Sequence, residues 1–203
     1  MPSGFRSIAF TAAVRAAQRA AAVTAQEQPP QHARDRLGSR ERQLIESRDS
    51  FFLATVTADG WPYVQHRGGP PGFLAVLDEQ RLRFPDYGGN RQFVTVGNLA
   101  DTPRVALLLL DYPTRTRLKL FGEARVRRAT AADFPMSRPT DPVAERTFEI
   151  TVRGFDWNCP QHITPRFTEL ELEHLVAPLQ ARVRELESRL ARLAPADPPV
   201  GGV

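Results

Sequence analysis

The amino-acid sequence predicts a mostly β fold, an antiparallel sandwich or barrel with helices before and after it. From residue 50 onward, short runs rich in β-branched and aromatic residues alternate with turn residues at intervals of about 8–12 residues. One of these turns contains Asp59-Gly60, a dipeptide typical of tight β-hairpins. The chain then ends in a long segment with apolar residues at helical spacing.

Seven segments have the composition and length of β-strands: 51–57, 63–67, 73–78, 81–84, 105–111, 117–127 and 148–155. The sixth segment alternates, so that Arg117 and Lys119 share one face of its strand and Leu118 and Leu120 share the other. Gly122 interrupts the same strand and predicts a bulge or bend there.

The segments before and between the strands predict short helices. The first 25 residues are rich in Ala and Arg and contain no acid, which is typical of an ordinary helix capped by Thr11 or of a mitochondrial transit peptide, and we favour the helix. Residues 26–41, with a Pro pair and a Gly, predict a linker. Residues 39–49, capped by Ser39, and residues 92–101 predict two further short helices.

The last part of the chain predicts one long helix over 168–193. Its apolar residues recur three or four positions apart and form one stripe, at Leu172, Leu175, Leu179, Val183, Leu186, Leu190 and Leu193. Pro178 would kink this helix or begin a second one. The stripe either packs on the chain's own β domain or pairs with a partner chain. The predicted organisation is an N-terminal helix and linker (1–38), a β domain (39–167), a C-terminal helix (168–194) and a disordered tail (195–203).

Composition and charge disfavour two classes of partner. The 203 residues are 41% hydrophobic and 25% charged, which is the balance of a soluble globular domain with tails. No apolar run approaches the roughly 20 residues of a membrane span, so no membrane association is expected. The net charge of +4 is carried by residues 1–48, where eight arginines face four acids. Because the β domain lacks a basic stripe with interleaved aromatics, nucleic acid is not an expected partner.

Cysteine and arginine usage indicate the cellular setting. A single cysteine rules out an internal disulfide framework and fits a reducing, cytoplasmic location. The strong preference for Arg over Lys is typical of a GC-rich bacterial genome.

The one cysteine lies in the segment WNCPQHI, three residues before His162. Cys159 and His162 are candidates for a nucleophile and its base, or for half of a metal site. Two ligands cannot close a tetrahedral site, and the other histidines are scattered along the chain, so no metal is expected. No Lys or Arg lies within two residues of Cys159 to favour a thiolate. The favoured role is a small buried filler in a loop.

Two glycine-rich segments are candidate anion sites. The segment YVQHRGGPPGF (63–73) ends a strand with Arg67, and DYGGNRQ (86–92) leads with Arg91 into an expected helix. Glycine lets backbone N–H groups approach an anion, while a helix N-terminus and arginine add positive charge. No Walker pattern and no GxGxxG before a helix is present, which disfavours ATP and a Rossmann-bound dinucleotide. Both segments together predict a phosphate pocket.

Four ordered segments resemble a known family. FFLATVTADGWPYVQHRGGPPGFLAVLD, GNRQFVTVGNLADTPRVALLLLDYP, TRLKLFGEARV and WNCPQHI are together similar to the pyridoxamine 5'-phosphate oxidase-like flavoproteins, the FMN-binding split barrels, in their flavin-nucleotide-binding branch. The resemblance spans about residues 40–167. It implies a small Greek-key β-barrel that forms a homodimer and binds FMN in clefts between the subunits.

The same resemblance implies a set of flavin-binding residues. They are Gln65, His66 and Arg67 after the second strand, Asn90, Arg91 and Gln92 at the phosphate, Arg117 near the flavin ring, and Trp157, Asn158 and Gln161 on a loop that reaches the partner's flavin. Gln92 stands where the oxidases usually have Lys, which leaves the phosphate site with one charge fewer. The oxidases bind pyridoxal phosphate through a C-terminal Arg-x-His segment that has no counterpart here, so vitamin B6 oxidation is not expected.

These observations favour an FMN-dependent oxidoreductase of unknown substrate, homodimeric, in which the flavin supplies the redox chemistry. No side chain is nominated as a catalytic acid or base. Two alternatives remain open: a flavin-binding or sensing protein without turnover, and a split barrel that holds haem or a deazaflavin coenzyme. Haem would need an axial histidine, for which His66 and His162 are the candidates.

Overall fold

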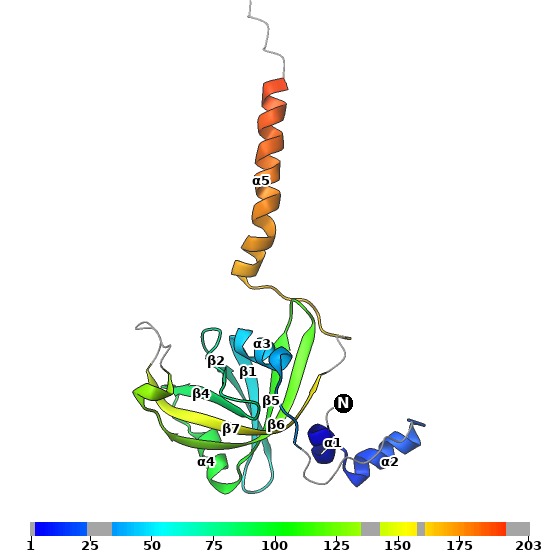
Figure 1. Cartoon of the computed structure of the whole chain (residues 1–203), viewed down its shortest axis with the longest axis vertical. Coiled ribbons are helices and arrows are strands. Elements are labelled where there is room, and N and C mark those ends of the chain that lie inside the picture. Colours follow the sequence, from blue (N-terminus) through cyan, green and yellow to red (C-terminus); the bar gives the residue numbers. More distant parts are fainter. Residues whose placement is uncertain (1–2, 24–33, 135–142, 158–160, 194–203) are drawn as a thin grey trace, which may run out of the picture. The chain divides into compact units, whose positions relative to one another are not determined.

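The computed structural model describes residues 3–23, 34–134, 143–157 and 161–193, and the chain divides into two compact units, Met1–Ile163 and Thr164–Val203. The first unit is built on one seven-stranded antiparallel sheet in the order β2-β1-β5-β6-β7-β4-β3. The strands are β1 (Ser50–Val56), β2 (Pro62–Gly68), β3 (Ala75–Val76), β4 (Arg81–Tyr87), β5 (Arg104–Asp111), β6 (Thr116–Arg128) and β7 (Ala144–Trp157). The sheet curls around the core to form a split barrel, as the sequence predicted (Figure 1).

Among the described residues, four α-helices lie in the first unit and a fifth lies in the second. They are α1 (Ser3–Ala9), α2 (Ala12–Ala20), α3 (Ser39–Ser47), α4 (Val94–Asp101) and α5 (Glu169–Leu193). In Figure 1, α3 and α4 lie at opposite ends of the curved sheet. The described part of the chain contains no helix that is long and apolar enough to cross a membrane.

Alternation of side chains along the strands separates the core from the surface. In β1, Phe51, Leu53 and Thr55 are buried, while the residues between them are exposed or half-buried. Stacked aromatic rings fill the centre of the core: the ring centroids of Phe84 and Phe148 lie 4.7 Å apart. Phe51 meets Phe84 edge-on at 5.2 Å. These contacts tie β1 to β4 and β7, which lie far from it in the sheet order.

Two glycines have the local roles that the sequence predicted. Gly60 adopts a positive φ of 86° in the turn between β1 and β2. Two backbone hydrogen bonds close this turn, from the Thr57 N–H to the Trp61 carbonyl and from the Gly60 N–H to the Thr57 carbonyl. At Gly122 the pairing of β6 with β7 changes register. A Cβ at this position would come within 2.6 Å of the Ile150 side chain, so the bulge requires glycine.

The N-terminal helix is fastened to the barrel by a buried carboxylate. Asp35 accepts hydrogen bonds from the backbone N–H groups of Gly4 (2.8 Å), Phe5 (2.9 Å) and Phe155 (3.1 Å). The Phe5 ring stacks on Phe121 with centroids 5.1 Å apart. A Cβ on Gly154 would collide with the backbone of Gly4 and Phe5, so only glycine lets α1 approach β7 this closely.

Three sequence predictions need correction in detail. The linker expected over 26–41 lies partly outside the described residues, but Asp35 and Leu37 within it are buried against the barrel rather than solvated. The strand expected over 73–78 shrinks to β3, because a turn closed by the Phe73 N–H and the Pro70 carbonyl (2.9 Å) occupies its start. The prediction that Ser39 caps α3 is wrong: Ser39 is the first residue of the helix, and Gly38 is its N-cap. The Glu41 side chain accepts a hydrogen bond from the Gly38 backbone N–H (2.9 Å).

The remaining helices follow the predicted pattern. Thr11 caps α2 by accepting a hydrogen bond from the Val14 N–H (3.3 Å). Helix α5 continues through Pro178 without a second start, and Thr168 and Glu171 cap it reciprocally. The tail expected over 195–203 lies outside the described residues.

Candidate functional site

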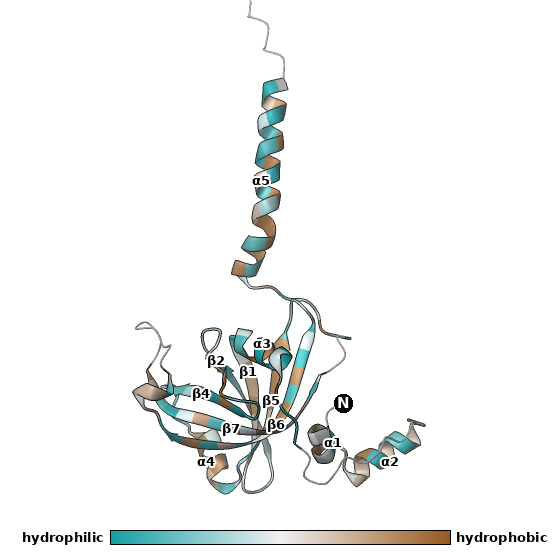
Figure 2. Ribbon diagram, viewed as in Figure 1, coloured by the Kyte–Doolittle hydropathy of each residue, from teal (hydrophilic) through white to brown (hydrophobic). Residues whose placement is uncertain are grey.

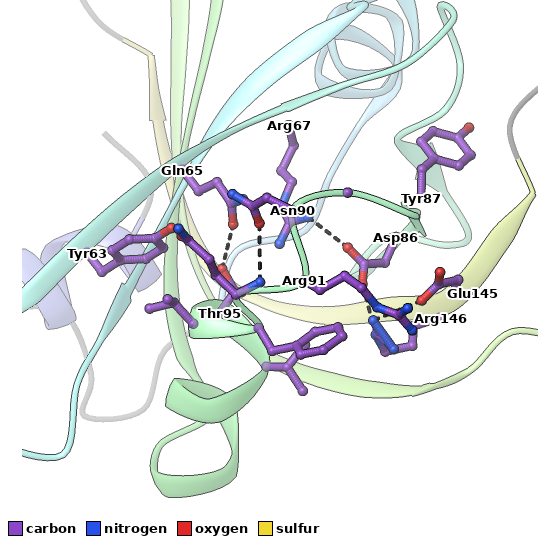
Figure 3. A pocket seen from close by; sticks show the side chains of 15 residues that line it. Tyr63, Gln65, Arg67, Asp86, Tyr87, Asn90, Arg91, Thr95, Glu145 and Arg146 are labelled. Carbon is purple, nitrogen blue, oxygen red and sulfur yellow. Dashed lines mark hydrogen bonds and ion pairs between the residues drawn. The ribbon is translucent and has the colours of Figure 1, made fainter.

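A small pocket lies where the sheet fails to close into a complete barrel. Strand β2 forms one edge of the sheet, and β4 lies near the other edge. Between them the pocket is lined by Tyr63, Gln65 and Arg67 of β2, Asp86 and Tyr87 of β4, the segment from Gly89 to Val96, and Glu145 and Arg146 of β7 (Figure 3). Its volume is about 70 Å³. This is room for a phosphate-sized group but far below the roughly 300 Å³ at which sites for whole cofactors begin.

Asp86 joins the two sides of the opening through two arginines. Its carboxylate accepts from the Arg67 Nη1 at 2.8 Å and from the Arg146 Nε at 2.9 Å (Figure 3). Arg67 is only 16% exposed, and its guanidinium lies 5.2 Å from the centre of the Phe148 ring. Its Nε is buried without a hydrogen-bond partner among the described residues. Arg67 therefore retains a donor that no described residue uses.

The N-terminus of α4 opens into the same pocket. Arg91 and Phe93, which precede the helix, both have left-handed backbone conformations, with φ of 59° and 53°. Such conformations are strained for residues other than glycine and concentrate at functional sites. Phe93, the N-cap residue, provides no side-chain cap, so the first backbone N–H groups of α4 are available to an anion. Arg91 is exposed and makes no ion pair with any described residue.

A hydroxyl–amide contact fixes the floor of the pocket. The Thr95 hydroxyl donates to the Gln65 side-chain carbonyl at 2.9 Å, which links α4 to β2. Behind it the Asn98 amide donates to the Thr55 hydroxyl at 2.8 Å, and both of these residues are buried. Because the lining holds three arginines against two carboxylates, the site has an excess positive charge. Its chemistry therefore fits an anion of phosphate size.

The structure brings together five of the residues predicted from sequence. Gln65, Arg67, Asn90, Arg91 and Gln92 all line the pocket. The side-chain Oδ1 of Asn90 accepts from the Gln92 backbone N–H at 3.3 Å and shapes the turn before α4. Sequence reasoning missed Asp86, although it stood within the segment singled out, and Arg146, which no local pattern marks. Arg146 arrives only through the pairing of β4 with β7, where it stands opposite Asp86.

The other predicted residues lie elsewhere. His66 points to the opposite face of β2, where its ring meets Phe52 at 5.7 Å. The Trp157 indole N–H donates to Glu41 at 2.6 Å, and Arg40 covers its ring at 4.0 Å. Gln161 and His162 are exposed. Asn158 and Cys159 lie outside the described residues, and no group of three or more His, Cys, Asp or Glu side chains suited to a metal occurs among those described.

Arg117 belongs to a broad apolar surface on the outside of the barrel. Strand register places Phe52 of β1 between His66 of β2 and Leu108 of β5, and Leu108 next to Lys119 of β6. We name as the outer face the side chains of β1, β2 and β5 that point away from the core: Phe52, Ala54, Val56, Val64, Ala106, Leu108 and Leu110. Arg117 lies opposite Leu110 in the pairing of β6 with β5, at the border of the outer face. The Arg117 Nε is buried without a hydrogen-bond partner among the described residues.

The family model for pyridoxamine 5'-phosphate oxidase matches residues 38–157, which contain every strand of the barrel and the whole pocket. The chain belongs to the pyridoxamine 5'-phosphate oxidase family. A comparison with curated proteins found no match.

A comparison with solved structures finds several that are similar to part of this chain. HupZ of Group A Streptococcus is 16% identical, with a TM-score of 0.50 over 64% of this chain and 99% of its own. An F420 reductase is 23% identical, with a TM-score of 0.45 over 59% of this chain and 98% of its own. An FMN-binding protein of Syntrophomonas wolfei is 11% identical, with a TM-score of 0.45 over 58% of this chain and 83% of its own. At 16% identity the likeness to HupZ concerns the fold alone.

Proposed function

We propose that this chain is a cytoplasmic, homodimeric FMN-binding protein that uses the flavin for a redox reaction on a small molecule. The observation that carries the proposal is the convergence of Arg67, Arg91 and Arg146 with the uncapped N-terminus of α4 in one phosphate-sized pocket. A phosphate monoester accepts charge-assisted hydrogen bonds from guanidinium groups and from helix N-terminal N–H groups alike. Family membership supplies the expectation that this phosphate belongs to a flavin.

The small volume of the pocket supports a second chain at the site. Once the phosphate occupies about 70 Å³, the rest of the flavin must lie beyond the pocket along the protein surface. The apolar outer face ends nearby at His66 and Val64, on the same strand as Arg67. A second copy laid on this face would exclude water from the flavin. Proteins of this family are commonly dimeric, which agrees with such a shared cleft.

The residues around the cleft have distinct proposed roles. Arg67, Arg91 and Arg146 would hold the phosphate, and Gln65 and Asn90 would fix its orientation. Arg117, at the border of the outer face, would stabilise negative charge on the reduced flavin. Bound FMN supplies hydride or electron transfer, while the protein supplies binding and charge. Trp157 and Gln161 stay predicted contacts of the partner's flavin, although Trp157 is bound to Glu41 within its own chain.

Replacement of Arg91 by Ala tests the phosphate assignment. The loss of one charge-assisted hydrogen bond, worth about 1.5–3 kcal/mol, should weaken FMN binding about 10- to 100-fold. Riboflavin, which lacks the phosphate, should bind with little change, and Arg125→Ala, an exposed arginine outside the pocket, should affect neither ligand. The measurement is a fluorescence titration of both flavins. Equal losses for FMN and riboflavin would remove the phosphate from this pocket.

An absorption spectrum of the purified protein tests the cofactor itself. Bound flavin absorbs in the blue, whereas haem shows a Soret band that would replace this proposal with a haem-binding one. Reduction of the bound flavin by a nicotinamide donor, followed by its reoxidation by an acceptor, would establish turnover. Tight FMN binding without turnover under any donor would assign the chain to flavin binding or sensing.

A further inference from the structure

The apolar side of α5 follows a seven-residue repeat. Within the helix, Val176, Val183 and Leu190 are spaced seven residues apart, and so are Leu172, Leu179 and Leu186. The two sets alternate at steps of four and three residues, which is the a and d pattern of a coiled coil. This repeat differs from the apolar stripe predicted from the sequence, because it includes Val176 and leaves Leu175 beside it, at position g.

These side chains are exposed on the described chain. Exposure ranges from 40% for Val176 to 67% for Leu190, although the helix is 25 residues long. Figure 2 shows hydrophobic and hydrophilic residues interleaved along α5. A helix of this length is stabilised mainly by covering its apolar side rather than by intrinsic propensity. The a and d side chains, which we call the seam of α5, therefore require another surface to cover them.

The residue types at positions a and d indicate how many helices the coiled coil contains. Valine at two of three a positions combined with leucine at every d position favours a parallel pair of helices over three or four. Pro178, which lacks a backbone N–H, falls at position c, on the side away from the a and d residues, and α5 runs through it. The helix can therefore present an unbroken a and d seam despite the proline.

The charges beside the seam select the partner and its direction. Arg182 and Arg189 occupy g positions, and Glu187 occupies an e position. Within the chain Glu185 pairs with Arg182 (2.6 Å) and Arg189 (3.7 Å), whereas Glu187 has no ion-pair partner among the described residues. In a parallel pair, g of one helix faces e of the next repeat on the other, so Arg182 meets Glu187 of a second copy. An antiparallel pair would instead set g against g, arginine against arginine.

We propose that α5 forms a parallel two-stranded coiled coil with α5 of a second copy of this chain. The pairing needs no flavin and uses no residue of the barrel. It therefore adds a second contact between copies, separate from the cleft of the proposed function, and each contact can fail while the other holds.

Disulfide crosslinking in the full chain tests both pairing and direction. With Cys159 replaced by Ser, Leu190→Cys places a thiol at the seam near the end of the helix, and Ser188→Cys places one at position f on the far side. We expect oxidation to give a covalent dimer of the Leu190→Cys chain and none of the Ser188→Cys chain. The same result is expected with and without added FMN. No crosslink at 190, or equal crosslinking at both sites, would overturn the proposal.

Mixing chains and reversing charges sharpens this test. A mixture of Leu172→Cys and Leu190→Cys chains should give only 172–172 and 190–190 disulfides, since a 172–190 product would show an antiparallel pair. The effective concentration of the 190 thiols, measured against a glutathione buffer, should fall about 3- to 30-fold in Arg182→Glu and in Glu187→Arg. It should recover in the double reversal. A further loss in the double variant would contradict the pairing of these two residues.

Discussion

At the scale of single residues, Asp86 sets the charge that an anion meets in the pocket. Its carboxylate is 11% exposed and engages Arg67 and Arg146 from opposite sides. A buried carboxylate between two guanidinium groups holds them in place, but it also cancels part of their attraction for a phosphate. Asp86 thus holds the two arginines in position and also weakens their attraction for a phosphate. A substitution at Asp86 measures which of these two effects is larger.

Replacement of Asp86 by Asn removes the charge and keeps the shape. We expect FMN to bind about tenfold more tightly, because the repulsion between the carboxylate and the phosphate disappears. Riboflavin affinity should not change, and the gain should shrink in high salt. Asp78→Asn, which removes the charge from a surface pair with Arg81 outside the pocket, is the matched control. Weaker FMN binding by Asp86→Asn would mean that holding the two arginines in place matters more than repulsion.

At the scale of elements, an ion-pair network fastens the far ends of β6 and β7. Asp133, in the 3-10 turn after β6, accepts two hydrogen bonds from Arg127, at 2.5 and 2.8 Å. These bonds, against the opposing effect of burial, hold the pKa of Asp133 far below its usual range. Burial alone would raise the pKa of Glu149, but hydrogen bonds from Arg83 and Arg127 outweigh it and lower that pKa as well.

These pKa shifts predict how stability responds to acid. A carboxylate whose folded pKa lies below its unfolded value of about 4 stabilises the fold above pH 4, and its contribution is lost as pH falls toward the folded pKa. Unfolding free energy should therefore decline from about pH 4 downward. Asp133→Asn should cost about 1–3 kcal/mol at neutral pH and make that decline shallower. Urea unfolding at several pH values tests this against Asp59→Asn, an exposed control, which should match the parent.

The attachment of α1 to β7 is a second feature of elements, and Gly154→Ala tests it. A methyl group there would displace Gly4 and Phe5, so the helix should detach while the barrel persists. Hydrogen exchange should then become fast at the Phe5 amide and stay slow in β5. Gly97→Ala, where a Cβ meets nothing within 4 Å, should leave α1 in place. Global unfolding by Gly154→Ala would show that α1 is integral to the core.

At the scale of the whole molecule, the chain has two apolar surfaces that its described residues do not cover. One is the outer face of the barrel, where Val64 is 60% exposed, and the other is the seam of α5. The two lie in separate compact units, so each surface can join copies by itself. A dimer held by two independent contacts should survive the loss of either one.

Removal of the contacts one at a time tests this arrangement. Val64→Glu should weaken pairing of the outer face about 100-fold or more, because association would bury a charge. We expect the full-length chain with Val64→Glu to remain a dimer. We also expect the unsubstituted chain, when it is shortened to end at Ile163, to remain a dimer. Val64→Glu in the shortened chain should be a monomer by light scattering. Val143→Glu, at an equally apolar but 84% exposed position, is the control and should leave every form dimeric.

The sequence revealed those features that depend on neighbouring residues. The strands, the Gly122 bulge and the Thr11 cap follow from local alternation and local hydrogen bonding. Arg67 and Arg91 could be found because glycine-rich segments flank them. Arg146 could not, because it reaches the pocket only through the register between β4 and β7, which pairs residues 60 positions apart.

Other features could not be predicted from the sequence, because the same local pattern is compatible with two different structures. A polar segment with glycine and proline is typical of a solvated linker, yet Asp35 within it is buried by hydrogen bonds to residues up to 120 positions away. His66 and Arg67 are adjacent in sequence, but neighbouring residues of a strand point to opposite faces. Only Arg67 therefore reaches the pocket, and sequence similarity alone could not separate them.

The attachment of α1 also sets an order of events during synthesis. Phe5 precedes its whole docking site in the chain, because that site consists of the carboxylate of Asp35, Phe121 in β6, and Gly154 and Phe155 in β7. This site does not exist until β7 has left the ribosome and paired with β6. Because such distant contacts form slowly, α1 is translated before β6 and β7 but docks only after they have paired. Until then, Phe5 remains open to chaperones and to proteases.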